Sequence, residues 1–264
     1  MQKYTTIELQ ILEPGVATVV LDRPEVRNAF NDRMIEELTE VFKHLESARK
    51  IKLICIKSSD KHFCAGADLN WMRASQEQTY DEVHKGSIKL YNMFNTISKM
   101  TIPVISSVSG AVFGGGLGLL AVSDYVIAEE KSIFCFSELK IGLLPATISP
   151  FVVRKIGYSA ANALFLSARK FDTEHALRIG LIHQISKKLE KDLHFLIEDF
   201  SQTAPQATNQ CKEMVRQIDD GVSDVKHYTA NLITRARMSD EGQEGISALL
   251  GKRKPSWVKK SKES

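Results

Sequence analysis

The sequence predicts an α/β fold in which helices and strands share one continuous core, and three observations lead to it. The 264 residues are 43% hydrophobic and 25% charged, as is usual for a globular protein that buries a substantial core. Strand-like and helix-like patterns alternate over the first 150 residues or so. From about residue 149 the strand signals fade. We therefore expect a core over 1–200 and a helical segment over 201–264.

The first elements follow from turn and capping signals. The run "TTIELQILEPGVATVVLDRP" predicts two short strands around the turn Glu13-Pro14-Gly15. A helix should start after Asn31 or Asp32, because either side chain can cap it. Apolar residues then recur at helical spacing and predict one buried stripe, which consists of Met34, Ile35, Leu38, Val41, Phe42 and Leu45.

The next elements alternate in the same way. We expect a strand over 51–57, an amphipathic helix over 80–99, a buried strand in "IPVISSVSG", and two further strands in "DYVIAEE" and "SIFCF". The helix should have one apolar side, made of Val83, Ile88, Tyr91, Phe94 and Ile97. Later runs look helical, with Gly157 and Gly180 as helix ends, and "IHQIS" predicts one last strand. Helices and the basic end "GKRKPSWVKKSKES" follow Pro205.

Charge and cysteine usage exclude several classes of function. The 35 basic residues are nearly matched by 32 acidic ones, so the net charge of +3 does not indicate a nucleic-acid-binding protein. The four cysteines show no CxxC spacing, which favours core thiols in a reducing compartment. His62 and Cys64 lack a second pair of ligands, so no metal site is expected, and Ser137 has no well-placed histidine partner. Without a signal peptide or a long apolar run, we expect a cytoplasmic protein without a membrane span.

Two glycine-bearing turns each follow a strand and open into a helix: "FCAGADL" at 63–69 and "GAVFGGGLG" at 110–118. Such a turn leaves backbone N–H groups free at a helix start, where they suit an anion or a carbonyl oxygen that develops negative charge. If the two turns converge, they would form an oxyanion hole. Tight structural connections are the alternative. Neither a dinucleotide fingerprint nor a P-loop is present.

Four blocks occur in order: "RPEVRNAFN", "FCAGADL", "GAVFGGGLGLLAVSDYVIA" and "FSELKIGLLPATISPFVVRKIG". Over essentially the whole chain they resemble the crotonase family, the enoyl-CoA hydratases and isomerases. The resemblance implies a ClpP/crotonase-like spiral of ββα turns with a C-terminal helical trimerisation segment. It also implies homotrimers, often paired into hexamers as dimers of trimers, an acyl-CoA thioester as substrate, and no cofactor besides the coenzyme A that the substrate carries.

The resemblance also assigns roles to residues. The backbone N–H groups of Ala67 and Gly115 would bind the thioester oxygen, and Glu138 would be the catalytic acid/base, with a pKa that Phe136 and Leu139 could raise. Lys252 would approach the CoA phosphates of a neighbouring subunit, although a solvated basic tail is the alternative. The residues expected to bind the acyl-CoA are Val26, Asn28, Ala65, Gly66, Asp68, Leu69, Gly114, Gly118 and Lys252.

Gly118 departs from the family pattern, because family hydratases carry a second carboxylate at this position. A hydratase would have to use Glu138 alone or with help from another group, and the missing side chain could widen the pocket for a branched acyl chain. The run "SELKIGLLPATISPFVVRKIG" resembles hydratases of the methylglutaconyl-CoA type. We therefore expect an enoyl-CoA hydratase for a short, branched substrate. A Δ3,Δ2-enoyl-CoA isomerase with one glutamate is the alternative, and an RNA-binding relative without catalysis is a remote one.

Overall fold

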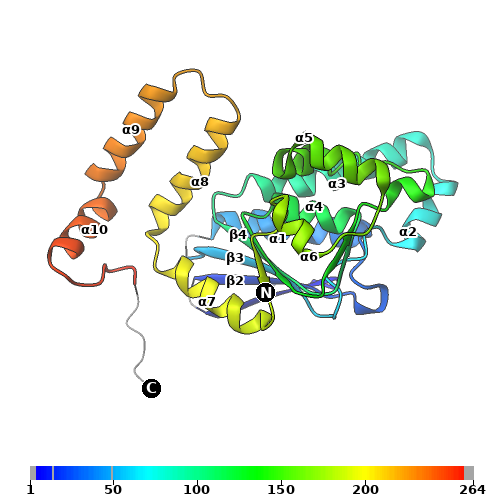
Figure 1. The fold of residues 1–264 in the computed structure, drawn as a ribbon, viewed down its shortest axis with the longest axis horizontal. Helices are drawn as coiled ribbons and strands as arrows, with labels where there is room; N and C mark the ends of the chain where they lie inside the picture. The colour runs from blue at the N-terminus through cyan, green and yellow to red at the C-terminus, as the bar shows by residue number, and fades with distance from the viewer. Residues whose placement is uncertain (1–3, 14, 49, 259–264) are drawn as a thin grey trace. The chain divides into compact units, whose positions relative to one another are not determined.

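The computed structural model describes residues 4–13, 15–48 and 50–258, without the side chains of residues 12 and 13 (Figure 1). They divide into a core unit, Met1–Met100 with Val104–Leu193, and a C-terminal unit, Thr101–Pro103 with His194–Ser264. The division falls within helix α7 (Leu189–Ser201), whereas the sequence-based boundary is at residue 200. Pro14 of the predicted first turn and residues 259–264 of the basic end lie outside the described residues.

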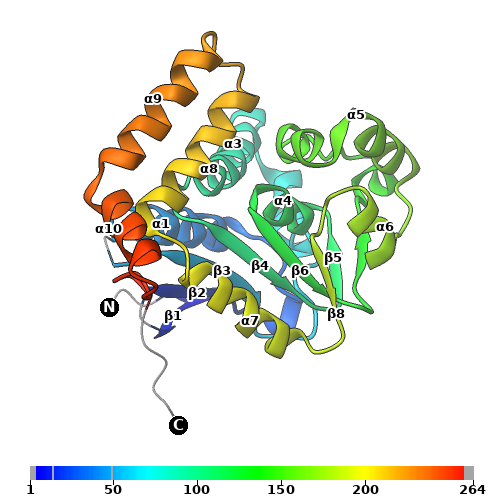
Figure 2. The same cartoon turned by 60° about the vertical axis from the view of Figure 1, so that its left-hand side comes forward.

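A six-stranded sheet in the order β1-β2-β3-β4-β6-β8 forms the centre of the core unit (Figure 2). Strand β1 pairs antiparallel with β2, and every other neighbouring pair is parallel. All side chains of β2 and β4 are buried, as expected for parallel strands that are covered on both faces. The strands are β1 (Ile7–Glu13), β2 (Val16–Leu21), β3 (Leu53–Ser58), β4 (Val104–Val108), β6 (Tyr125–Glu129) and β8 (Gln184–Ser186).

A second, two-stranded parallel sheet pairs β5 (Ala111–Phe113) with β7 (Ile133–Cys135). The sequence predicts β7 but not β5, because β5 has only three residues and glycine stands on both sides of it. An isolated bridge joins Cys64 to Val112, so the first glycine-bearing turn continues this small sheet. The two turns are therefore neighbours in space although about fifty residues separate them in the sequence.

Helices α1, α3 and α4 lie on one side of the large sheet (Figure 2). The Asn31 side chain caps α1 by accepting a hydrogen bond from the N–H of Met34 at 2.9 Å, and the predicted apolar stripe of α1 is buried. In α3 only the second half is buried: Phe94 and Ile97 are, whereas Val83, Ile88 and Tyr91 are exposed. The bounds of these helices are α1 (Asp32–Ser47), α3 (Tyr80–Ser98) and α4 (Gly115–Val122).

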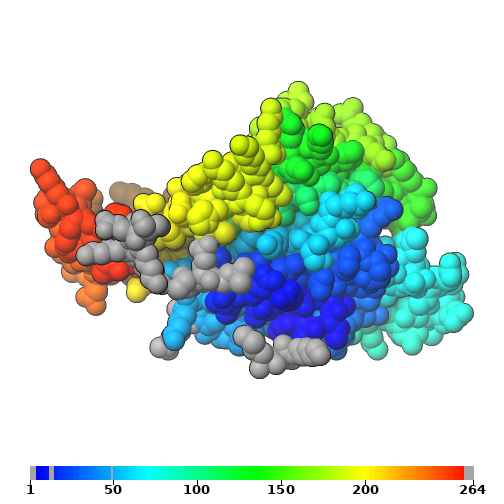
Figure 3. Space-filling view, turned by 90° about the horizontal axis from the view of Figure 1, so that it is seen from below, coloured from blue at the N-terminus to red at the C-terminus, as the bar shows by residue number. Residues whose placement is uncertain are grey.

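Further helical segments connect or follow these elements, and the segment from α2 to the start of α3 projects at the edge of the core unit (cyan, Figure 3). The predicted break at Gly157 is confirmed, because its φ of 77° divides α5 in two, and Gly180 follows α6 with a φ of 75°. The segments are α2 (Leu69–Ala74), α5 (Ser149–Ser167), α6 (Thr173–Arg178), and the 3-10 helices η1 (Pro24–Val26), η2 (Ser75–Glu77) and η3 (Glu138–Ile141).

The C-terminal unit contains α8 (Pro205–Asp219), α9 (Val225–Met238) and α10 (Asp240–Leu250). The Glu241 carboxylate of α10 accepts hydrogen bonds from the first N–H groups of α8, at Gln206 and Ala207. Within one chain these helices leave many apolar side chains exposed, namely Val215, Ile218, Ile233, Met238, Leu249 and Leu250. That surface suits the predicted association between subunits, which stays a prediction.

Two further sequence expectations concern cysteines and membrane spans. Cys55, Cys64 and Cys135 are buried thiols, as expected, whereas Cys211 is exposed in the single chain. Burial raises the pKa of both Cys55 and Cys64 to about 12. In the described part of the chain, none of the helices combines the length and the apolar character that crossing a membrane requires.

Candidate active site

The two glycine-bearing turns meet at Gly66 and Gly114. Both residues have a positive φ, 96° and 49°, which L-residues with a side chain rarely adopt. A Cβ atom on Gly66 would lie 3.1 Å from the carbonyl oxygen of Phe113 and 3.6 Å from Cα of Gly114. The sequence-based expectation of converging turns is confirmed, and glycine is required because the two backbones approach so closely.

Backbone pairing directs the N–H group of Ala67 away from its own neighbours. The N–H of Phe30 donates to the carbonyl of Gly66 at 2.7 Å, and the N–H of Asp68 donates to the carbonyl of Phe30 at 2.9 Å, which forms a parallel bridge between Phe30 and Ala67. In such a bridge the N–H of the central residue points to the side opposite its partner. The Ala67 N–H is therefore directed away from Phe30.

Gly115 supplies the corresponding group on the second turn, because it is the first residue of α4 and its N–H has no partner within the helix. Neither the N–H of Ala67 nor that of Gly115 makes a hydrogen bond to another of the described residues. The ring of Phe30 packs under Gly115, where a Cβ atom would lie 3.1 Å from Cδ2 of that ring. Phe30 thus contacts both turns, one through its backbone and the other through its ring.

Glu138 lies beside the second turn. The N–H of Gly114 donates to the carbonyl of Cys135 at 3.0 Å, so the turn is tied to the strand that leads into η3. Oε1 of Glu138 lies 3.2 Å from the position that a Cβ on Gly114 would take. Oε2 is buried and has no hydrogen-bond partner among the described residues. The carboxyl group therefore borders the junction of the two turns.

Burial raises the pKa of the Glu138 carboxyl above its usual value, although hydrogen bonds from the backbone of Glu138 and Ser137 act in the opposite direction. A carboxyl with a raised pKa exchanges protons more readily near neutral pH than an exposed one. Two free N–H donors and this carboxyl together can polarise a carbonyl oxygen and move a proton at a neighbouring carbon atom.

Gly118 does not open the space that its missing side chain suggests. A Cβ atom there would lie 2.6 Å from Cγ2 of Ile148 and 2.7 Å from the ring of Phe94, both of which are buried. The hypothesis that Gly118 widens a pocket is therefore wrong in this form, because neighbouring apolar side chains already fill the place. The residue packs tightly inside the core unit.

The other predicted binding residues differ in their accessibility. Val26, at the end of η1, and Ala65, in the first turn, are half-buried, and Leu69, the first residue of α2, is exposed. Lys252 is exposed in the C-terminal unit, with a φ of 50°. Their binding of an acyl-CoA stays a prediction.

Asn28 and Asp68 were expected to line the binding groove, but their side chains are buried and bonded within the protein. Oδ1 of Asn28 accepts from the N–H of Arg23 at 2.7 Å, and its Nδ2 donates to Ser58 Oγ at 2.8 Å and to the carbonyl of His62 at 3.2 Å. These side chains hold the backbone of the first turn.

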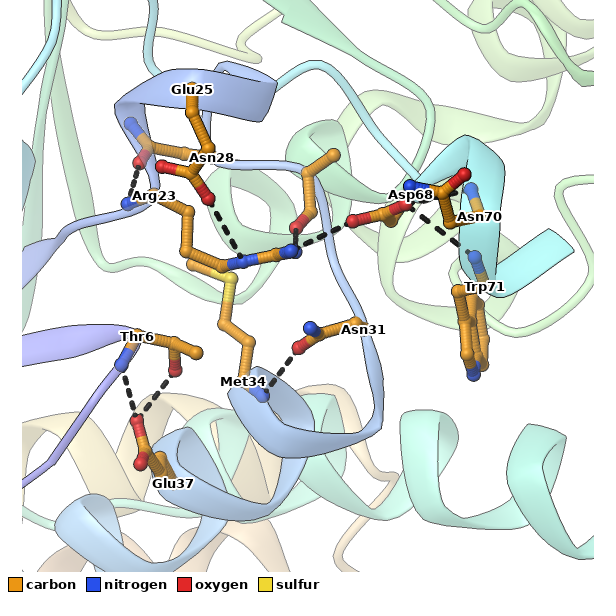
Figure 4. Close-up of polar contacts among 11 residues, drawn as sticks. Thr6, Arg23, Glu25, Asn28, Asn31, Met34, Glu37, Asp68, Asn70 and Trp71 are labelled. Carbon is orange, nitrogen blue, oxygen red and sulfur yellow. Dashed lines mark hydrogen bonds and ion pairs between the residues drawn. The ribbon is translucent and has the colours of Figure 1, made fainter. Parts of the chain in front are cut away.

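Sequence reasoning missed Arg23, although it begins the quoted block "RPEVRNAFN". Its Nη1 donates to the carbonyl of Ala29 at 2.6 Å, and its Nη2 donates to Oδ2 of Asp68 at 2.8 Å (Figure 4). The sequence signal that could have identified it is an arginine just before η1 together with an aspartate in the first glycine-bearing turn. A distance of 45 residues in the sequence hides that pairing.

Comparison with known proteins agrees with this arrangement. The sequence model of the enoyl-CoA hydratase/isomerase family matches residues 12–260. The chain is 37% identical to an enoyl-CoA hydratase from Shewanella pealeana, whose crystal structure superposes with a TM-score of 0.92 and 97% coverage of both chains. It is 32% identical to AtuE from Pseudomonas aeruginosa, with a TM-score of 0.93 and coverage of 97% of this chain and 100% of that one.

Curated relatives carry the names of both reactions. The chain is 30% identical over 246 residues to the enoyl-CoA hydratase AKT6-1 of Alternaria alternata, which covers 92% of this chain and 80% of that protein. It is 27% identical to a trans-2-decenoyl-[acyl-carrier-protein] isomerase of Streptococcus mutans, with 94% and 97% covered. By the family match and the shared fold, this chain belongs to the enoyl-CoA hydratase/isomerase family and has the crotonase fold.

Proposed function

We propose that this protein adds water across the α,β double bond of an enoyl-CoA thioester. The proposal rests on one observation: among the described residues, the buried Oε2 of Glu138 has no hydrogen-bond partner, and neither have the nearby N–H groups of Ala67 and Gly115. Several of the similar proteins bear hydratase names, which supports the same reaction.

The two N–H groups would bind the thioester oxygen. Attack of water at Cβ moves the electron pair of the double bond toward the carbonyl and produces an enolate oxygen that carries negative charge. Donors already in place stabilise that charge, and the loss of one such donor typically lowers kcat by about 100- to 1000-fold. Ala67 and Gly115 would therefore lower the barrier without moving.

Glu138 would carry out both proton transfers. As a carboxylate it accepts a proton from water while the water oxygen bonds to Cβ. As a carboxylic acid it then returns a proton to Cα, which restores the thioester and the starting state of Glu138. The raised pKa of Glu138 suits this double role, because burial makes the carboxylate a stronger proton acceptor than an exposed glutamate. The reaction needs no cofactor.

A second candidate is isomerisation of a 3-enoyl-CoA, and the packing at Gly118 favours it. Phe94 and Ile148 fill the place of a second carboxylate, so this side of the site offers no group to hold a water molecule. In an isomerisation Glu138 would take a proton from Cα and return it at Cγ, and no water would be consumed. One glutamate is sufficient for that transfer.

The acyl chain and the assembly are also proposals. A short, branched chain is supported by the resemblance of "SELKIGLLPATISPFVVRKIG" to hydratases of the methylglutaconyl-CoA type, and no longer by Gly118. Trimers or hexamers are supported by the exposed apolar side chains of the C-terminal helices. In such an assembly Lys252 would approach the CoA phosphates of a neighbouring subunit.

Absorbance of the conjugated thioester distinguishes the reactions. Hydration of crotonyl-CoA or 3-methylglutaconyl-CoA should lower it, whereas isomerisation of a 3-enoyl-CoA should raise it. Glu138→Gln should lower kcat by about 1000-fold or more and leave binding of the unreactive butyryl-CoA intact. If the protein turned over only the 3-enoyl-CoA, the proposed hydratase activity would give way to the isomerase activity. If Glu138→Gln turned over substrate as fast as the wild type, the proposed role of Glu138 would be refuted.

A further inference from the structure

The position of Ala67 depends on a short segment, residues 27–30, that is itself unusual. Arg27 and Asn28 have φ values of 54° and 55°, although neither is a glycine. Left-handed backbone is unfavourable for a residue with a side chain, and less so for asparagine than for arginine. The N–H of Ala65 donates to the carbonyl of Arg27 at 2.9 Å, so the first turn, which contains Ala67, is bonded directly to this segment.

Arg23 connects the strained segment to the residue that follows Ala67. Its guanidinium bonds the carbonyl of Ala29 through one nitrogen and Asp68 through another, and the side chains of Arg23 and Asp68 are only 13% and 5% exposed (Figure 4). A planar, rigid group that donates to two acceptors fixes their separation and orientation. Ala67 directly precedes Asp68 and pairs with Phe30, which directly follows Ala29.

Asp68 also caps the start of α2. Its Oδ1 accepts from the N–H groups of Asn70 and Trp71, at 2.8 and 3.4 Å, while its Oδ2 binds Arg23. Burial alone would raise the pKa of Asp68, but the hydrogen bonds from Arg23, Asn70 and Trp71 outweigh it and hold this pKa below its usual value. The carboxylate therefore stays ionised and paired with Arg23 at neutral pH.

We infer that Arg23 is a positioning residue for the oxyanion donor at Ala67. It acts through Ala29 and Asp68, and it holds the Ala67 N–H at the point where the thioester oxygen would bind. This inference rests on the proposed function, because it concerns the same site. Its consequence is that loss of Arg23 should weaken polarisation of the thioester more than it weakens binding of CoA.

The chain offers a matched control. Arg33 pairs with Glu37, a second buried carboxylate, at 2.7 Å, and Glu37 also accepts a hydrogen bond from Thr5. It accepts a further one from Thr6 (Figure 4). Hydrogen bonds likewise hold the pKa of Glu37 below its usual value against the effect of burial. This pair ties β1 to α1 and has no bond to the two turns. Asp68→Asn and Glu37→Gln compare two buried carboxylates that each pair with an arginine. Arg33→Met controls for the loss of an arginine–carboxylate pair, although the Arg33 side chain is 57% exposed and that of Arg23 is 13% exposed.

The decisive measurement is the carbonyl stretching frequency of bound butyryl-CoA, which cannot turn over. The wild-type protein should lower this frequency relative to free butyryl-CoA, and Arg33→Met should do the same. Arg23→Met should lose most of the shift, and its kcat should fall about 10- to 100-fold with KM changed less than about 3-fold. Arg23→Lys should recover part of kcat, because an ammonium can pair with Asp68 but cannot reproduce the planar fork.

Several outcomes would overturn the inference. One is an Arg23→Met protein whose carbonyl frequency shift and kcat both equal those of the wild type, whatever its melting temperature. Another is an equal loss of kcat in Arg33→Met. If Arg23→Met does not fold, Arg23→Lys and Asp68→Asn against Glu37→Gln decide in the same way. Absence of both turnover and the frequency shift in the wild-type protein would instead refute the proposed function and this inference with it.

Discussion

The two turns present equivalent N–H groups but hold them by different physical means. The Ala67 turn is fixed by polar bonds, in which Arg23, Asn28 and Asp68 satisfy one another and the backbone. The Gly115 turn is fixed by close packing. We therefore expect the first turn to tolerate substitutions that keep its hydrogen bonds, and the second turn to tolerate substitutions that keep the side-chain volume.

Packing at the second turn leaves no room for a side chain on Gly115 or Gly116. A Cβ on Gly116 would lie 2.9 Å from Cβ of Cys64, and one on Gly115 would press on the ring of Phe30. Nearly all of α4 is buried and apolar, so the helix cannot shift to make room. The first turn is packed as closely only at Gly66, where the two backbones meet, and is otherwise held by hydrogen bonds of the Arg23, Asn28 and Asp68 side chains.

Among changes within the two turns, the largest effect is expected from Gly114→Ala. Its methyl group would meet Oε1 of Glu138 at 3.2 Å and separate the two turns, so we expect kcat to fall by about 100-fold or more. Steady-state kinetics on the enoyl-CoA substrate measures it. Gly221→Ala is the control, because Gly221 has a φ of 84° but no atom within 4 Å of a Cβ. Equal losses in both variants would show that backbone strain, and not contact with Glu138, is responsible.

Gly118→Ala tests the packing of the same helix through stability. The added methyl group overlaps Phe94 and Ile148, and we expect a loss of about 1–3 kcal/mol in the free energy of unfolding. Denaturant unfolding measures it. Gly86→Ala, in the exposed part of α3 with no atom within 4 Å, should instead stabilise by up to about 1 kcal/mol. Phe94→Leu should rescue Gly118→Ala; a Gly118→Ala protein as stable as the wild type would contradict the close packing.

Activity and stability should depend on pH in different ranges, because the carboxyl groups beside the two turns have pKa values shifted in opposite directions. Glu138, beside the second turn, has a raised pKa, so kcat/KM should fall as the pH drops through a value above 4.5, where its reactive carboxylate becomes protonated. Asp68, in the first turn, has a lowered pKa. The stability that Asp68 contributes is complete above about pH 3.9 and is lost as the pH falls through its folded value. Loss of activity and loss of structure at the same pH would contradict this separation.

The smallest effect concerns the stability of Glu138→Gln. A carboxyl whose pKa is raised by burial destabilises the folded state as the pH rises through its folded value, because the charged form is desolvated. Glu138→Gln should therefore melt a few degrees higher than the wild type at pH 7, about 2–4 °C. The difference should vanish below about pH 4.5. Calorimetry at both pH values measures it, and a constant difference would exclude the titration of Glu138 as its cause.

Local signals account for much of the agreement between sequence and structure. Asn31 caps α1 because its side chain reaches an N–H three residues away, and the apolar stripe of α1 follows from a period that repeats within one helix. The glycine-bearing turns are visible for the same reason. The short strand β5 is not, because three residues contain no period.

By itself, the sequence determined the alternation of strands and helices, the two turns, and the family to which their motifs belong. Only the tertiary structure decided that Gly66 touches Gly114, that Arg23 reaches Asp68, and that Phe94 and Ile148 occupy the space beside Gly118. The physical reason is distance along the chain: periodicity and caps act over a few residues, whereas these contacts depend on how the β strands and helices pack together.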